Sequence, residues 1–160
     1  MPKFVNNRNP RNLEKLRIAD KPQGWELDQE GRSYWNKVTL DITGRHISGR
    51  IHHKDGKVPI SASTEEWCIK KYLYSTKDTS AAKAVGQVLA DRCIRSGITE
   101  VACFFPEDEK KKEKVAVFLS SLEEKGISLI EPPQMYVPWA LNYPYLDEKS
   151  WEVDIPEENK

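Results

Sequence analysis

Apolar and polar residues alternate along residues 37–63 with the period of two that is typical of strands buried on one face. Three stretches show the alternation: 38–42, 47–51 and 58–62. A Thr-Gly pair at 43–44 and an Asp-Gly pair at 55–56 interrupt it, and Asp-Gly is a strong hairpin signal because glycine readily takes a positive φ. Pro59 cannot donate a ladder hydrogen bond, so we expect the third strand at a sheet edge. The pattern predicts a three-stranded antiparallel meander.

Two helices are predicted after the meander. Ser63 lies three residues before Glu66, a capping-box spacing that satisfies backbone N–H groups at the start of a helix. A longer helix is predicted from residues 78–80, each of which can cap it, to Gly97. Small residues give this second helix little side-chain bulk: Ala81, Ala82, Ala84, Gly86 and Ala90. We therefore expect part of it to lie close on the sheet.

Residues 98–105 form a short apolar run between Gly97 and Pro106, which is typical of an interior strand. The next apolar residues follow the i, i+3, i+4, i+7 spacing of a helix: Val115, Phe118, Leu119 and Leu122. Gly126 ends that helix, and residues 127–130 predict a last strand before two prolines. The element order thus predicts an α/β domain, with helices packed on a mixed five-stranded sheet.

The two ends of the chain lack such periods, and we expect extended arms there. Residues 1–36 form a basic N-terminal arm with room for a short helix over 12–19, because five cations up to residue 19 face only Glu14. Residues 132–160 form a C-terminal extension that is rich in aromatic residues and proline and ends acidic. Its aromatic side chains are predicted to anchor in grooves of this domain or of a neighbouring protein: Tyr136, Trp139, Tyr143, Tyr145 and Trp151. Residues 37–131 are then the folded domain.

Charge is unevenly distributed along the chain, although its formal sum is zero. Residues 1–60 hold 12 cations against 7 anions, residues 61–125 hold 11 of each, and residues 126–160 hold 2 against 7. A basic front half and an acidic tail suit a protein that touches RNA with one side and protein or solvent with the other. The alternative is that charge merely falls this way over an ordinary surface.

The polar positions of the predicted meander are the strongest candidates for RNA contact. Arg50 and His52 alternate with apolar residues on the second strand, and His46 shares their parity. A positive, partly aromatic sheet face can take phosphates and sugars. Together with basic residues of the arm, the first strand and the hairpin, the candidate set is Arg8, Arg11, Arg17, Lys37, Arg45, His46, Arg50, His52, Lys54 and Lys57. An ordinary solvated sheet face explains the same pattern equally well on these residues alone.

No motif predicts an enzyme, a cofactor or a metal site. The sequence lacks a phosphate-binding loop and the GxGxxG, HExxH and GxSxG strings. Asp41 lies where a ribonuclease-H-like nuclease places a Mg²⁺-binding carboxylate, but the strand predicted at 98–105 offers only Glu100, at its very start. Three cysteines without C-x-x-C spacing predict free thiols in a reducing compartment. We therefore expect no catalysis, no small-molecule substrate and, without a run of about 20 apolar residues, no membrane contact.

Three ordered segments resemble the L-eighteen family of large-subunit ribosomal proteins. They are the basic-His-Ile step at 45–47, Ser-Ala-Ser-Thr at 61–64 and AAKAVGQVLADRCIRSGITEV at 81–101. The resemblance spans residues 37 to 131. Residues 7–14, NRNPRNLE, are similar to the entry segment of the mitochondrial branch of that family.

This resemblance implies a ribonuclease-H-like layered fold, of the kind found among translational-machinery components, and a structural role in the large subunit of the mitochondrial ribosome, in the matrix. It implies a place in the central protuberance beside 5S rRNA or the structural tRNA that replaces it, with large-subunit rRNA and neighbouring ribosomal proteins as partners. Bacterial members carry a Gly-, Tyr- and Arg-rich loop where this chain has PEDEKKK at 106–112, so that loop's RNA contact is not carried over. A non-ribosomal RNA-binding or protein-interaction module is the alternative, and a Mg²⁺-dependent nuclease a remote one.

Overall fold

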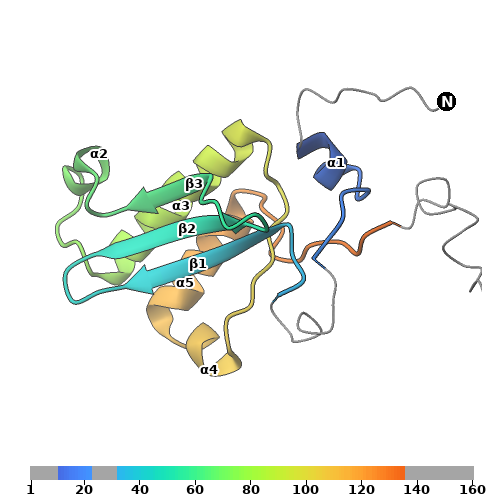
Figure 1. Ribbon diagram of the computed structural model, residues 1–160. Coiled ribbons are helices and arrows are strands. Elements are labelled where there is room, and N and C mark those ends of the chain that lie inside the picture. Colours follow the sequence, from blue (N-terminus) through green and yellow to red (C-terminus); the bar gives the residue numbers. More distant parts are fainter. Residues whose placement is uncertain (1–10, 23–31, 136–160) are drawn as a thin grey trace, which may run out of the picture.

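A three-stranded antiparallel sheet forms the centre of the computed structural model, which describes residues 11–22 and 32–135 (Figure 1). Its strands, in the order β1-β2-β3, are β1 (Asn36–Ile42), β2 (Ile47–His53) and β3 (Ile60–Ser63). The predicted meander is therefore confirmed. Gly56 takes the positive φ of 78° that the Asp-Gly hairpin signal anticipates, and β3 begins directly after Pro59 at the sheet edge.

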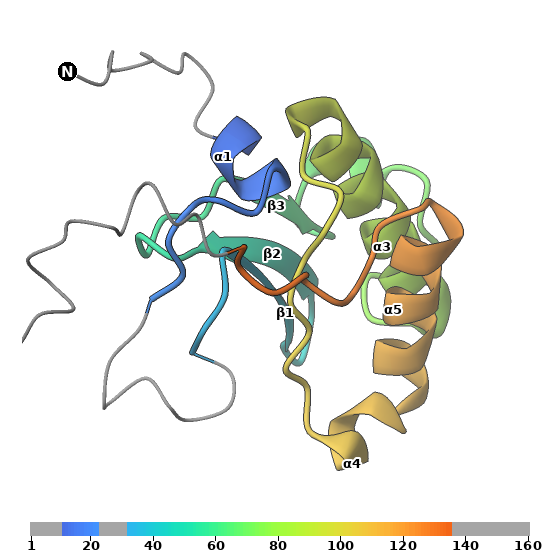
Figure 2. The same cartoon turned by 90° about the vertical axis from the view of Figure 1, so that its right-hand side faces the viewer.

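Two helices cover one face of the sheet, and three short helices lie around it (Figure 2). The helices are α1 (Arg11–Lys15), α2 (Trp67–Lys70), α3 (Thr79–Ser96), α4 (Glu107–Lys110) and α5 (Glu113–Glu124). The long helix α3 ends as predicted at Gly97, whose φ of 81° lets its N–H bond the carbonyl groups of Cys93 and Ile94. The covering pair is thus α3 and α5, the two long helices.

The core lies between this helix pair and the inner face of the sheet. Ile51 and Val38 of the sheet pack with Val85 and Leu89 of α3 and with Phe118 of α5, among other buried apolar residues. All five side chains are essentially excluded from water. Their positions follow the two periods seen in the sequence, two along the strands and 3.6 along the helices.

Gly86 is the closest point of contact between α3 and α5. A Cβ atom placed there would lie 1.9 Å from Ser121 Oγ and 3.0 Å from the Phe118 carbonyl oxygen. Ser121 Oγ is held in place because it donates to that same carbonyl at 2.7 Å. Gly86 therefore faces a second helix, while Ala81 and Ala82 of the same helix pack against Ile47 of the sheet, as the small residues of α3 predicted.

The prediction of five strands is wrong for the described residues, which contain three. Residues 98–105 and 127–130 each join through isolated parallel bridges, Lys37 with Ala102 and Glu100 with Ser128. Two backbone hydrogen bonds form at each junction and the ladders go no further. One physical cause is Ser128, whose Oγ accepts the Ile130 N–H at 3.4 Å and donates to the Ile130 carbonyl at 3.0 Å, turning the chain locally.

The reciprocal hydrogen bonds predicted for Ser63 and Glu66 form around a turn, but the helix begins only at Trp67 and is one turn long. Glu66 Oε1 accepts the Ser63 N–H at 3.1 Å, and Ser63 Oγ accepts the Glu65 N–H at 3.2 Å. Arg92 of α3 then binds Glu66 through two hydrogen bonds of 2.8 and 2.5 Å, and it also donates to the Ser61 carbonyl. This bidentate pair fastens α2 and the end of β3 to α3.

Stability should depend on pH through this pair. The Arg92 hydrogen bond holds the pKa of Glu66 below its ordinary value of 4.5, so the stabilisation is present above pH 4.5 and is lost as pH falls through the lowered value. Both side chains are about one-third exposed, so we expect Glu66→Gln to cost about 0.5–1 kcal/mol at pH 7 and less at pH 3, where more of the Glu66 carboxylate is protonated. Urea unfolding at the two pH values measures this, with Glu124→Gln as the exposed control. A cost that stays constant with pH would contradict the assignment.

The two flanking segments meet at the end of the sheet opposite α2 (Figure 1). The Met135 N–H donates to the Arg17 carbonyl at 2.8 Å, and the Lys21 N–H donates to Gln134 Oε1 at 3.0 Å. Gln134 Nε2 returns a hydrogen bond to Asp20 Oδ1 at 3.0 Å. Residues 17–21 and 131–135 therefore run beside each other, although more than 100 residues separate them in sequence.

Candidate nucleic-acid interface

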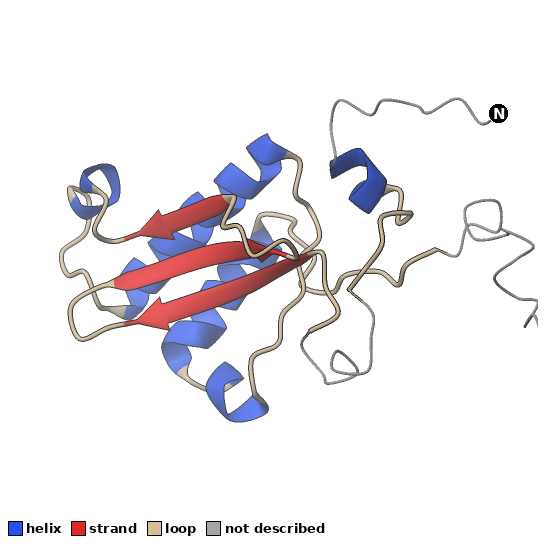
Figure 3. Ribbon diagram, viewed as in Figure 1, coloured by secondary structure: helices blue, strands red, loops and turns tan. Residues whose placement is uncertain are grey.

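The outer face of the sheet carries the polar residues of all three strands and is left uncovered by α3 and α5 (Figure 3). We call it the open face; it consists of Lys37, Thr39, Asp41, Ser48, Arg50, His52, Ser61 and Ser63. Strand register brings three predicted site residues close together, because Lys37 pairs with His52 and Arg50 pairs with Thr39. Cross-strand partners lie about 5 Å apart, so two cations and an imidazole share a small area.

Lys37 lies beside two aromatic rings at the β1 edge of the open face. Its Nζ lies 5.9 Å from the centroid of the Tyr34 ring and 5.6 Å from that of Phe104, whose rings are 6.3 Å apart. Phe104 is 39% exposed. A cation beside accessible rings can contact a phosphate and a sugar or base together.

Arg50 shares the open face with an acidic residue. Its Nη1 lies 3.2 Å from Asp41 Oδ2, and both side chains are about half exposed. Ion pairs this exposed contribute less than about 1 kcal/mol, so a phosphate can compete with Asp41 for Arg50. Asp41, the carboxylate considered for a nuclease, thus lies beside Arg50 in this structure.

The other predicted cations lie at the two ends of β2. Arg45 and His46 form the turn before it, next to α2, and Lys54 and Lys57 form the hairpin after it. Lys54 is partly engaged, because its Nζ donates to the Asp20 carbonyl at 2.6 Å. The structure therefore does not gather the whole candidate set into one site.

The candidates of the N-terminal arm are only partly described. Arg11 lies on α1 and makes an ion pair of 3.1 Å with Glu14, whereas Arg17 is exposed and has a positive φ of 64°. Arg8 lies outside the described residues. So do all five aromatic residues predicted to anchor the tail: Tyr136, Trp139, Tyr143, Tyr145 and Trp151.

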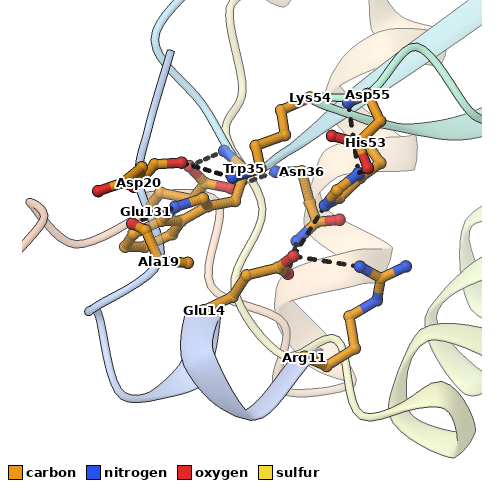
Figure 4. Close-up of polar contacts among 10 residues, drawn as sticks. All are labelled: Arg11, Glu14, Ala19, Asp20, Trp35, Asn36, His53, Lys54, Asp55 and Glu131. Atoms are coloured by element: carbon orange, nitrogen blue, oxygen red, sulfur yellow. Dashed lines mark hydrogen bonds and ion pairs between the residues drawn. The ribbon is translucent and has the colours of Figure 1, made fainter. Parts of the chain in front are cut away.

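A buried polar cluster connects the arm to the sheet, and the sequence gave little indication of it (Figure 4). Glu14 Oε1 lies 2.8 Å from His53 Nε2, and Glu14 Oε2 accepts a hydrogen bond of 3.0 Å from Asn36 Nδ2. His53 Nδ1 lies 3.3 Å from the Asp55 backbone nitrogen and 3.2 Å from Asp55 Oδ2, so Asp55 contacts the other side of the ring. The only available signal was parity, since His53 falls on the inward side of β2, where it is 6% exposed.

A second buried carboxylate holds the C-terminal segment to the start of β1. Glu131 accepts the backbone N–H groups of Trp35 at 2.9 Å and Asn36 at 2.6 Å, and it lies 3.3 Å from Lys21 Nζ. Burial raises the pKa of Glu131 even though these donors act in the opposite direction. Lys21 Nζ also lies 4.3 Å from the Trp35 ring centroid. The arm and the C-terminal segment are therefore fixed at the end of the sheet nearest Lys54 and Lys57.

Metal-site geometry is absent from the described residues, where no three His, Cys, Asp or Glu side chains lie close enough to hold an ion. Burial raises the pKa of Cys93 to about 12, so that thiol stays protonated at neutral pH. Among residues 11–22 and 32–135, no helix has the length and apolar character needed to cross a membrane.

Relatives of this chain are found among ribosomal proteins, although no family model matches it. It is 44% identical over 130 residues to large ribosomal subunit protein uL18m of Caenorhabditis elegans, which covers 79% of this chain and 76% of the relative. It is 36% identical over 92 residues to large ribosomal subunit protein uL18 of Shewanella sp. strain ANA-3 and of Shewanella oneidensis, covering 58% of this chain and 78% of each relative.

These relatives define the class as ribosomal proteins of the large subunit, which are structural proteins and not enzymes. The chain belongs to the uL18 family, in its mitochondrial branch. The resemblance drawn from residues 37 to 131 is therefore confirmed, as is the predicted localisation to the mitochondrial ribosome in the matrix.

Proposed function

We propose that this protein is a scaffold in the central protuberance of the mitochondrial large subunit, where it binds a structured RNA and neighbouring ribosomal proteins. The RNA is 5S rRNA or the structural tRNA that replaces it. One observation carries the proposal: the open face presents Lys37, Arg50 and His52 in register on a sheet whose other face is closed by helices. Family membership supports the large subunit as the setting.

The proposed mechanism is recognition by shape and charge. Lys37 and Arg50 neutralise phosphates, while the serine and threonine hydroxyl groups of the open face reach 2′-hydroxyl groups and phosphate oxygens. Lys54 and Lys57 extend the basic surface towards the arm, whose Arg11 and Arg17 continue it. Because the inner face is packed against α3 and α5, these groups are held on a rigid surface and little ordering is needed on binding.

We extend the proposal to the layout of the chain. The two isolated bridges add residues 98–105 beside β1 and residues 127–130 beyond them, and both run parallel to their neighbours. That order supports a ribonuclease-H-like arrangement within a domain spanning 37–131. The arm 1–36 then follows RNA, and the extension 132–160 contacts a neighbouring ribosomal protein through its aromatic residues.

Charge reversal on the open face tests the proposal. Lys37→Glu combined with Arg50→Glu should weaken binding to the partner RNA by roughly 10- to 100-fold at physiological salt and lower the slope of log K against log salt by about 2, because two phosphate contacts are lost. Fluorescence anisotropy with labelled 5S rRNA and structural tRNA measures both quantities.

The matched control is Lys111→Glu with Lys114→Glu, an equal change of charge directly after α4 and on α5. If the control weakens binding as much as the open-face variant does, the effect is one of net charge and the open face is not the interface. If the open-face variant binds RNA as tightly as the wild type, the open face is likewise not the interface.

A further inference from the structure

Aromatic side chains project into solvent from α2 and the turn after it, at the end of the sheet opposite the arm. Trp67 is 75% exposed, Tyr72 is 81% exposed and Tyr74 is fully exposed. Lys71 Nζ lies 5.5 Å from the Trp67 ring centroid and 5.7 Å from the Tyr72 ring centroid. Rings of this size are normally buried or partnered, so a surface that presents two of them around one cation calls for a binding role.

A basic hollow lies next to these rings, where α2 and its turn face the β1–β2 turn. Its volume is about 400 Å³, and the side chains that line it are Arg45, His46, Lys70, Ser75, Thr76 and Lys77. None of them is acidic. Arg45, Lys70 and Lys77 form no ion pair with another described residue, in contrast to Arg50 on the open face.

The walls of the hollow are fixed by hydrogen bonds that do not involve the side chains of Arg45, Lys70 and Lys77, although the His46 ring lies 3.4 Å from Thr64 Oγ1. Thr76 Oγ1 donates to the Arg45 carbonyl at 2.6 Å, which joins the two turns. Thr64, fully buried behind them, accepts the Ile47 N–H at 3.1 Å through its Oγ1. The nearby carboxylate of Glu66 is occupied by Arg92. The cationic groups are therefore held near one another and left available.

We propose that this surface, the α2 patch (Arg45, His46, Trp67, Lys70, Lys71, Tyr72 and Lys77), binds unpaired nucleotides of RNA. Trp67 and Tyr72 stack on bases, and the hollow receives the phosphates between them. Aromatic rings alternating with cations are how proteins hold single-stranded nucleic acid, because every base has a face to stack and every linkage carries a negative charge. A protein partner fits less well, since the cores of protein interfaces are depleted of lysine.

The α2 patch rests on the proposed function but is separate from the open face. The open face suits the sugar-phosphate surface of a paired helix, whereas the α2 patch suits a loop, a bulge or an end. One structured RNA with both a paired helix and unpaired nucleotides would then bind at two places. Its helix would contact the open face, and its unpaired nucleotides would contact the α2 patch beside the β1–β2 turn.

The test uses the full chain, a short oligouridylate as a single-stranded probe and a blunt RNA duplex as a paired probe. Trp67→Ala with Tyr72→Ala should weaken oligouridylate binding by at least about tenfold, since stacking on each ring is lost, and should leave duplex binding unchanged. Lys70→Glu with Lys77→Glu should lower the salt slope for oligouridylate by about 1.4, at about 0.7 per phosphate contact on a single strand. Lys111→Glu with Lys114→Glu is again the charge control.

Equal binding of oligouridylate by the wild type and both α2-patch variants would overturn the inference. If the aromatic variant keeps its RNA affinity but no longer co-sediments with large subunits, the patch contacts protein, and the inference is likewise overturned. In both of these cases, loss of duplex binding in the open-face variant would still support the proposed function. Failure of the α2-patch inference can therefore be distinguished from failure of the proposed function. Circular dichroism checks that each variant is folded, since Lys37 and Lys114 are only partly exposed.

Discussion

Gly86→Val is expected to lower the free energy of unfolding by about 2–3 kcal/mol, as overpacking of a well-packed interior does. The substituent would enter the closest contact between α3 and α5, where even a Cβ atom lies 1.9 Å from Ser121 Oγ. Rotation of Ser121 does not remove the conflict, since the Phe118 carbonyl oxygen lies 3.0 Å away and belongs to the backbone. Urea unfolding followed by circular dichroism measures the loss.

Two further variants make this prediction specific. Ala116→Val places the same β-branched side chain on the exposed side of α5 and should cost only the difference in helix propensity, under about 1 kcal/mol. Gly86→Ala should be destabilising alone and less so with Ser121→Ala, which removes the nearest clashing atom. A Gly86→Val protein as stable as the wild type would show that the two helices are not packed at this distance.

Glu14→Ala is expected to release α1 from the sheet and to cost about 3 kcal/mol, because it leaves buried polar groups without a partner. His53 Nε2 and Asn36 Nδ2 both lose their acceptor. Asn36 Oδ1 is already buried without a hydrogen bond among the described residues, so the site has little capacity to compensate. Trypsin should then cut faster after Lys15 and Arg17.

Asn12→Ala is the matched control, since Asn12 is an exposed residue on the same short helix. It should leave both the unfolding curve and the cleavage rate close to those of the wild type. If Glu14→Ala behaves like this control, the buried cluster does not hold the arm. By holding α1 against the sheet, the buried cluster keeps Arg11 and Arg17 at a fixed position relative to the open face.

Local patterns predicted the parts of this fold that local interactions determine. The alternation of 37–63 predicted three strands because the side of a strand on which a residue lies depends only on its own position, and it put Arg50 and His52 on one face. Their pairing with β1, which brings Lys37 beside His52, came only from the structure. Gly97 ended α3 because a positive φ is needed there. The same alternation places His53 on the buried side of β2, but the sequence did not indicate which residue it contacts there.

Contacts between distant residues were beyond the reach of these patterns. Glu14 and His53 are 39 residues apart and meet through the path of the whole chain, and the pairing of Arg50 with Asp41 depends on strand register. The fourth and fifth predicted strands were apolar enough to be strands, but each pairs through a single bridge, and hydrogen bonding between Ser128 and Ile130 turns the chain locally in the second of them. Trp67 and Tyr72 lie on and just after α2, which is only four residues long, and the spacing of apolar residues in the sequence did not indicate so short a helix.

Binding of the full chain to three RNAs across a salt series tests the central claim, that this uL18-family protein is an RNA scaffold. The RNAs are 5S rRNA, the mitochondrial structural tRNA and an unrelated hairpin. The account predicts tight binding to one of the first two, with a salt slope that corresponds to about five neutralised phosphates at about 0.7–0.9 each. Equal, weak binding to all three, with a shallow slope, would contradict it.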